Sequence, residues 1–176
     1  MRQVLVVVDI QKDFVDGALG SPEAVSMVDK AARKIKEFHG DIFVTYDTHF
    51  ENYLSTAEGK KLPVCHCIKG TPGWELDKTI ANALAGKNYT VVEKLSFGSL
   101  VLPDLIGNAA STEDFQITLI GLCTDICVVS NALILKAAFP EKDIFVDASC
   151  CAGVTVESHN AALATMKMCQ INVIGG

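Results

Sequence analysis

The sequence predicts a three-layer α/β/α fold built on a mainly parallel, doubly wound sheet of six strands. Two observations carry this prediction. Short β-branched apolar runs alternate with longer helical patterns along the whole chain. Each apolar run is continuous and does not alternate with polar residues, which is typical of parallel strands covered on both faces. We therefore expect right-handed strand–helix–strand crossovers and a single domain over residues 1–176.

The apolar runs place the six strands. They are expected over residues 3–8, 41–46, 89–93, 116–120, 143–146 and 171–174. Helices are expected over residues 22–38, 73–85, 99–106, 124–138 and 155–168. The first of them has Ser21 as its N-cap and Pro22 at its first position, and Gly40 follows as a stop. Residues 50–72 show neither pattern, and a loop of this length inside a domain is usually functional or disordered.

Composition limits the classes of partner. The 176 residues are 49% apolar, and 15 basic and 21 acidic side chains give a net charge of -6. With no dense Lys/Arg run, nucleic acid and anionic membrane surfaces are not expected as partners. The N-terminal apolar run is too short to span a membrane and ends in Asp9 without a cleavage site. Seven cysteines, an odd number, then predict reduced thiols and a cytoplasmic protein.

Ligands of doubly wound sheets bind beyond the carboxyl ends of the strands. Asp9, Asp47, Lys94 and the segment 123–127 all lie at or just after a predicted strand end. Cys127 also lies near the start of a helix, where backbone N–H groups and the helix dipole favour a thiolate. Lys94 can lower a thiol pKa, and Asp9 can accept and return a proton. The alternatives are a structural cysteine, a solvated lysine and a turn-capping aspartate.

A second set of polar residues surrounds the long loop. Asp47, His49 and His66 are suitable ligands for zinc, iron or manganese, and three protein ligands leave coordination positions open. A polar loop network is the alternative interpretation. Phe14 and Trp74 are candidate aromatic walls for a flat substrate, although core packing is the commoner role of such residues.

Three segments together resemble the isochorismatase-like cysteine hydrolase superfamily. They are Val8-Asp9-Ile10-Gln11-Lys12-Asp13-Phe14, Val92-Glu93-Lys94 and Gly121-Leu122-Cys123-Thr124-Asp125-Ile126-Cys127-Val128. The pair Asp47 and His49, with the segment His66-Cys67-Ile68-Lys69-Gly70-Thr71-Pro72-Gly73, is similar to the nicotinamidase branch. The resemblance covers nearly the whole chain.

The resemblance implies a role for each site residue. Asp9 takes the proton of Cys127, which attacks an amide carbonyl and forms a thioester, while Lys94 stabilises the charged groups. Backbone N–H groups of Cys123 and Cys127 form the oxyanion hole, next to a cis peptide bond between Leu122 and Cys123. Asp47, His49 and His66 become ligands of a divalent metal, with zinc favoured over iron or manganese. A homo-oligomer is also expected.

The sequence departs from the nicotinamidase pattern in two places. Residues 61–66 lack the tryptophan that often precedes the metal-binding histidine, and Cys123 stands where alanine is more usual. Nicotinamide is the first substrate hypothesis. Because of these departures, another small amide, ureido or carbamoyl compound is kept as the alternative. Isochorismate cleavage, a non-catalytic binding role and a redox role of Cys123 with Cys127 rank lower.

Overall fold

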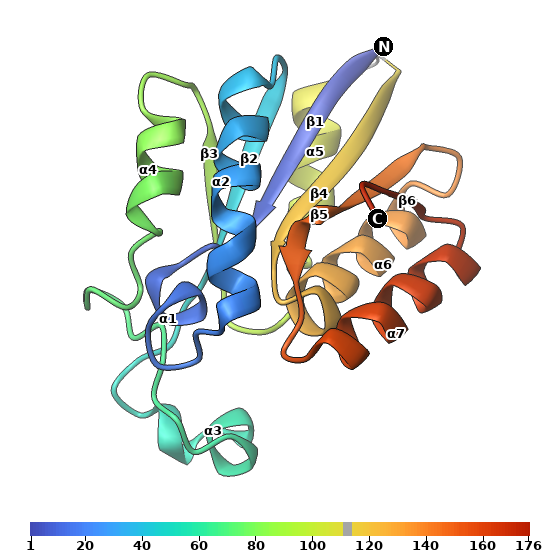
Figure 1. Ribbon diagram of the computed structural model, residues 1–176. Coiled ribbons are helices and arrows are strands. Elements are labelled where there is room, and N and C mark those ends of the chain that lie inside the picture. Colours follow the sequence, from blue (N-terminus) through green and yellow to red (C-terminus); the bar gives the residue numbers. More distant parts are fainter. Residues whose placement is uncertain (111–113) are drawn as a thin grey trace.

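The computed structural model describes residues 1–110 and 114–176, which form a six-stranded sheet with helices on both faces (Figure 1). The strands are β1 (Arg2–Val8), β2 (Asp41–Asp47), β3 (Thr90–Lys94), β4 (Phe115–Leu122), β5 (Ile144–Ala152) and β6 (Asn172–Ile174). Their order across the sheet is β3-β2-β1-β4-β5-β6, and every pairing is parallel. The predicted doubly wound α/β fold is confirmed.

The helices divide between the two faces of the sheet. They are α1 (Lys12–Val15), α2 (Pro22–Glu37), α3 (Ala57–Lys61), α4 (Lys78–Leu84), α5 (Leu102–Ala110), α6 (Val129–Ala138) and α7 (Val156–Met168). Helices α1, α2 and α4 cover one face, and α5, α6 and α7 cover the other (Figure 1). Helix α3 lies apart, beyond the carboxyl ends of the strands (Figure 1).

Strand β1 shows why the apolar runs are continuous. Leu5 and Val7 pack with the α2 side of the core, while Val4, Val6 and Val8 pack with the α5–α7 side. Successive side chains of a strand point to opposite faces, so a strand covered on both sides must be apolar at every position. The continuous apolar run of β1 is therefore explained by the helices that cover both faces of the sheet.

The structure differs from the predicted elements at several boundaries. The segment 50–72, expected to lack regular structure, contains a 3₁₀ turn, η1 (Tyr53–Ser55), and the short helix α3. The helix expected over 73–85 is confined to α4, and the one expected over 99–106 runs over α5 instead. Strand β5 extends to Ala152, six residues beyond its predicted end at Val146, and a register shift interrupts its pairing with β4.

The helix expected over 124–138 has two parts. It begins with a π-helical turn, η2 (Thr124–Val128), in which the Val128 N–H donates to the Cys123 carbonyl oxygen at 3.0 Å. Helix α6 follows directly. Single π turns in helices are rare and occur frequently at functional sites. None of the helices in the described ranges is long and apolar enough to cross a membrane.

Candidate active site

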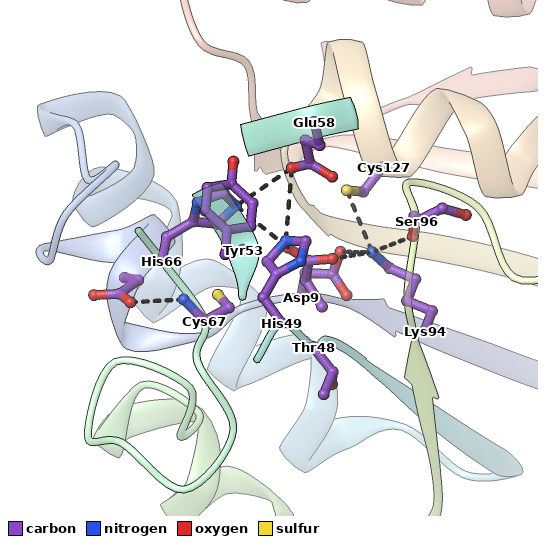
Figure 2. A network of polar contacts seen from close by, with 12 residues as sticks. Asp9, Thr48, His49, Tyr53, Glu58, His66, Cys67, Lys94, Ser96 and Cys127 are labelled. Atoms are coloured by element: carbon purple, nitrogen blue, oxygen red, sulfur yellow. Dashed lines mark hydrogen bonds and ion pairs between the residues drawn. The ribbon is translucent and has the colours of Figure 1, made fainter. Parts of the chain in front are cut away.

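The topology brings the predicted catalytic residues to one edge of the sheet. Asp9 follows β1, Asp47 ends β2, Lys94 ends β3, and Cys127 lies in the turn after β4. The central strands β1 and β4 are the place where the strand order reverses, and ligands of open α/β sheets bind at that point. All four side chains are buried, and Lys94 contacts the other three. Figure 2 shows Asp9, Lys94 and Cys127 converging.

Lys94 is the centre of this cluster. Its Nζ lies 2.6 Å from Asp9 Oδ2, 3.3 Å from Asp47 Oδ1 and 3.5 Å from Cys127 Sγ, and it donates to the Ser96 carbonyl oxygen at 3.1 Å (Figure 2). Burial alone would lower the pKa of Lys94, but the charges of Asp9 and Asp47 raise it above its ordinary value. The ammonium group therefore stays charged beside the thiol.

Asp9 is held in place from β2. Its φ is 48°, in the left-handed region, its N–H donates to the Thr45 carbonyl oxygen at 3.2 Å, and the Thr45 hydroxyl donates to Oδ1 at 2.6 Å. Burial raises the pKa of Asp9, against the opposing effect of Lys94. A carboxyl group with a raised pKa is a better proton acceptor for a thiol.

The Cys127 thiol has a raised pKa as well. Burial is the main cause and the Asp9 charge adds to it, while Lys94 acts in the opposite direction. In the free protein the sulfur therefore keeps its proton, so a nucleophilic attack requires transfer of that proton to a neighbouring base. Asp9 is the carboxylate whose charge acts most strongly on the thiol.

Cys127 is carried by the π turn η2, which is fixed to the rest of the fold by side chains on either side. The Thr124 hydroxyl lies 2.8 Å from Nδ1 of His159 on α7, and the Asp125 carboxylate accepts from the Val154 N–H at 3.1 and 3.3 Å. Asn131 donates to the Cys127 carbonyl oxygen at 2.8 Å. The peptide bond between Leu122 and Cys123 is cis, as the resemblance implied.

The predicted metal ligands also come together. One ligand atom each from Asp47, His49 and His66 lies within 4.8 Å of the others, and all three side chains are buried. Asp47 Oδ2 is 3.0 Å from His49 Nε2 and 3.5 Å from His66 Nε2. Burial alone would raise the pKa of Asp47, but His49, His66 and Lys94 hold it well below its ordinary range. The carboxylate is therefore ionised and available as a ligand.

The chemistry of this group fits a divalent cation. His66 Nδ1 lies 2.8 Å from the Val64 carbonyl oxygen, and a proton on Nδ1 leaves the Nε2 lone pair directed at the other two residues. His49 Nε2 is buried and lies 3.0 Å from Asp47 Oδ2, but the two atoms are not aligned as a hydrogen bond, a costly arrangement unless a further group binds between them. Two imidazoles and one carboxylate suit zinc, iron or manganese.

Glu58 on α3 is a site residue that the sequence analysis missed. Its Oε1 lies 3.6 Å from Nε2 of both His49 and His66 (Figure 2). The ring of Tyr53 packs against the same two imidazoles, with centroids 4.6 and 5.0 Å away. Glu58 therefore adds a further oxygen facing the ligand group, and Tyr53 fixes the planes of the histidines. The only sequence signal for Glu58 was its acidic side chain within the long segment 50–72 that also holds His66.

A cavity of about 500 Å³ opens above Cys127. The residues that line it are Phe14, Leu19, Gly20, Ser21, Ala24, Asp47, Glu58, Leu62, His66, Phe97, Cys123, Ile126, Cys127, Gly153 and Val154. Phe14 thus lies where it was expected, with its ring 5.5 Å from that of His66. Burial raises the pKa of the Cys123 thiol to about 12, so this second sulfur of the cavity lining stays protonated.

Trp74 does not line this cavity, and the structure places it otherwise than predicted. Its indole N–H donates to the Thr48 hydroxyl at 3.0 Å, and its ring packs against Tyr46 with centroids 5.1 Å apart. These contacts hold the side chain on the outer side of β2. Phe97, from the loop after β3, is the second aromatic wall, and no periodic pattern indicates it.

The fold has known counterparts among solved structures. The nicotinamidase PncA from Bacillus subtilis has a TM-score of 0.82 at 25% identity, covering 99% of both chains. The pyrazinamidase of Pyrococcus horikoshii, in complex with zinc, has a TM-score of 0.81 at 25% identity and full coverage of both chains. The N-carbamoylsarcosine amidase from Thermoplasma acidophilum has a TM-score of 0.78 at 26% identity, covering 99% of this chain and 96% of the other.

Sequence comparisons point the same way. The isochorismatase family protein PncA of Bacillus subtilis (strain 168) is 30% identical over 143 residues, which are 76% of this chain and 78% of that protein. The family model of the isochorismatase domain matches residues 3–175. With its Asp9, Lys94 and Cys127 cluster at the switch point of the sheet, this chain belongs to the isochorismatase domain family.

Proposed function

We propose that this chain is a cysteine-dependent amidohydrolase that converts nicotinamide to nicotinate and ammonia through a thioester. One observation carries the proposal: the Lys94 ammonium contacts both Asp9 and Cys127 on the floor of the cavity. Hydrolysis of an amide bond is further supported by the family match and by the amidase structures that resemble the chain. The choice of nicotinamide rests on the nicotinamidase and pyrazinamidase among those structures.

The proposed mechanism uses Asp9 twice. Its carboxylate takes the Cys127 proton as the sulfur attacks the amide carbonyl carbon, and the protonated Asp9 then gives that proton to the departing ammonia. Asp9 next removes a proton from a water that attacks the thioester, and it returns that proton to the Cys127 sulfur as the C–S bond breaks and the carboxylic acid product leaves. Because the Asp9 pKa is raised by burial, its protonated form is accessible as an intermediate state.

Lys94 keeps the negative charge in the cluster balanced during these transfers. Whether the charge resides on Asp9 or on the sulfur, the ammonium lies within 3.5 Å of it. The charge that develops on the substrate oxygen needs a separate partner. We propose the backbone N–H groups of Cys123 and Cys127, at the two ends of the turn that carries the nucleophile.

Asp47, His49 and His66 would hold a divalent metal ion, with zinc proposed first and iron or manganese as alternatives. When bound, such an ion supplies a Lewis-acidic centre that orients the pyridine nitrogen or a water next to the nucleophile. The zinc in the Pyrococcus horikoshii structure supports this choice. Glu58 faces the same imidazole nitrogens and would balance the charge of the ion.

A second candidate function is hydrolysis of another small amide, ureido or carbamoyl compound. The likeness to N-carbamoylsarcosine amidase favours it, as does Leu62 at the cavity mouth in the stretch that lacks a tryptophan. Cleavage of isochorismate is not favoured, because that reaction has no use for a nucleophilic cysteine.

The test is ammonia release from nicotinamide with added zinc or manganese, by wild type and Cys127→Ala side by side. Cys169→Ala is the matched control, because Cys169 is an exposed thiol at the end of α7, far along the chain from the site. We expect turnover by wild type and the control, and none by Cys127→Ala. No turnover by any of them, together with alkylation of Cys127 faster than of the exposed cysteines, would keep the hydrolase and reject nicotinamide.

A further inference from the structure

The solvent-exposed part of the cavity lining is apolar. Leu62, Phe97 and Val154 form its mouth, and 37%, 45% and 57% of their respective surfaces are exposed. They come from three separate segments: the end of α3, the loop after β3 and the loop after β5. Leu19 and Ala24 continue the apolar lining farther inside. Exposed apolar side chains that line one cavity mark a place where a ligand removes them from water.

The size of the cavity exceeds the needs of a single ring. A volume of about 500 Å³ lies in the range that accommodates ligands of drug size. Nicotinamide, one six-membered ring with one amide, placed with its carbonyl at Cys127 and its nitrogen toward Asp47 and His66, leaves the mouth uncovered. An additional group on the ring, pointing away from the metal ligands, would fill that space.

Charge restricts what this group can be. Among the described residues that line the cavity, two are carboxylates, Asp47 and Glu58, and none is lysine or arginine. The nearest cation below the floor, Lys94, is already paired with Asp9 at 2.6 Å and Asp47 at 3.3 Å. Lys61 lines the adjoining hollow with Leu62 and Phe97, but it does not line this cavity. An anionic substituent held within the cavity would therefore lose its hydration without gaining a partner there.

We infer that the preferred substrates are uncharged aromatic carboxamides that carry an apolar substituent on the ring, seated against Leu62, Phe97 and Val154. This inference rests on the proposed amidase function and deepens it by defining the substrate class. It also separates the two candidate functions, because a carbamoyl amino acid brings a carboxylate that this lining does not pair. Leu62 is then a specificity-determining residue, since its size sets how far the mouth opens.

The test compares three substrates with the zinc-loaded full chain. They are nicotinamide, a nicotinamide with a butyl group on the ring carbon meta to the carboxamide, and an analogue in which a carboxylate replaces the terminal methyl of that chain. Covering the mouth should raise kcat/KM about tenfold for the butyl compound over nicotinamide. The carboxylate analogue should fall at least about tenfold below the butyl compound. Binding to Cys127→Ala, measured by calorimetry, should follow the same order.

Two variants test whether the preference for the butyl compound arises at Leu62. Leu62→Trp should abolish the advantage of the butyl compound over nicotinamide by filling the mouth. Leu54→Trp, an equally large change at an exposed residue of η1 that does not line the cavity, should leave that ratio unchanged. Nicotinamide turned over as well as the butyl compound, or an effect of Leu54→Trp equal to that of Leu62→Trp, would overturn the inference and leave the amidase function in place. No ammonia from any of the three carboxamides would overturn the proposed function and the inference with it.

Discussion

The side-chain amide of Gln11 satisfies both backbone groups of Asp47. Its oxygen accepts from the Asp47 N–H at 2.8 Å, and its nitrogen donates to the Asp47 carbonyl oxygen at 2.9 Å and to the Trp74 carbonyl oxygen at 2.8 Å. The pairing of β1 with β2 ends at Val8 and Thr45. Asp47 lies two residues beyond Thr45, where β1 no longer supplies a backbone partner, and the Gln11 side chain takes that place. Gln11 therefore fixes Asp47, which contacts Lys94 and the two histidines of the predicted metal group.

We predict that Gln11→Leu weakens zinc binding. The buried N–H and carbonyl groups of Asp47 would lose their partners, which should lower the free energy of unfolding by about 1–3 kcal/mol. Loss of the group that orients a ligand should reduce zinc affinity by about 10- to 100-fold. The measurements are urea unfolding of the metal-free protein and zinc titration against a competing chelator. Gln116→Leu is the control, because Gln116 also bonds through its side chain, to Gln3, but near the opposite ends of the strands. Equal effects of the two variants would contradict the prediction.

Lys94→Met should damage both stability and catalysis. The variant leaves the buried carboxylates of Asp9 and Asp47 without their shared cation, which should cost about 3–5 kcal/mol of unfolding free energy. The rate of ammonia release should fall on the order of a hundred- to a thousandfold, because the charge on the sulfur loses its partner. Chemical unfolding and steady-state kinetics measure the two effects.

A double variant separates the effect of Lys94 on stability from its effect on catalysis. Asp9→Asn together with Lys94→Met removes one carboxylate along with the ammonium, so it should regain part of the lost stability without regaining activity. If Lys94→Met alone unfolds at the wild-type denaturant concentration, Lys94 does not compensate the two acids.

The fold could be predicted because its signal is local. Every residue from Val4 to Val8 is apolar, and the two faces of β1 both need that. The residues of the candidate site could be predicted for a related reason: each lies at or soon after the end of an apolar run, and the parallel topology brings such ends together. The five-residue π turn η2 could not be predicted in this way, because no local pattern distinguishes it from the helix that follows, and one of the contacts that fix it joins Thr124 to His159, 35 residues away in the sequence.

The residues that were missed or misplaced depend on the conformation of loops. Glu58 reaches the two imidazoles because α3 lies over the carboxyl ends of the strands, and no periodic pattern in the sequence predicts that helix. Phe97 lines the cavity from an irregular loop. Trp74 was predicted as a cavity wall because its side chain is a large aromatic ring. Its indole N–H instead donates to Thr48, and its ring packs on Tyr46. Such contacts join distant segments and are not encoded in the spacing of any one of them.

Asp125→Ala should act on substrate binding more than on the chemical step. The Asp125 carboxylate holds the N–H of Val154, and Val154 and Gly153 line the cavity. Without this link the wall can shift relative to Cys127, so KM should rise about tenfold while kcat changes much less. Asp125→Asn retains one acceptor oxygen and should restore most of KM, which a merely structural role of the charge would not do.

The control for this variant is Asp104→Ala. Asp104 is also an acidic residue in the first turn of a helix, but it is exposed on α5 and does not line the cavity. Steady-state kinetics with nicotinamide decide the matter. A fall in kcat with an unchanged KM would show that Asp125 positions the nucleophile and not the wall.

Lys34 and Asp147 predict a pH-dependent contribution to stability away from the site. Lys34 Nζ on α2 lies 2.6 Å from Asp147 Oδ2 on β5, and Ser149 donates to Oδ1 through its N–H at 3.1 Å and its hydroxyl at 2.7 Å. Burial alone would raise the pKa of Asp147, but these bonds hold it below its ordinary value. A carboxyl whose pKa is lower in the folded state stabilises the fold above the pKa of the unfolded chain, about 3.9, and this contribution is lost as the pH falls through the folded value.

Lys34→Met should therefore lower the free energy of unfolding by about 1 kcal/mol near pH 7, because the pair is only partly exposed. The difference from wild type should begin to shrink as the pH falls below about 4, where Asp147 is protonated in the unfolded chain, and should continue to shrink as the pH falls through the lower pKa of the folded wild type. Urea unfolding at a series of pH values measures it, with Lys30→Met as the control at an exposed lysine of the same helix. A difference that persists undiminished at the lowest pH would mean that Lys34 stabilises the fold through the packing of its methylene chain, and not through the charge of Asp147.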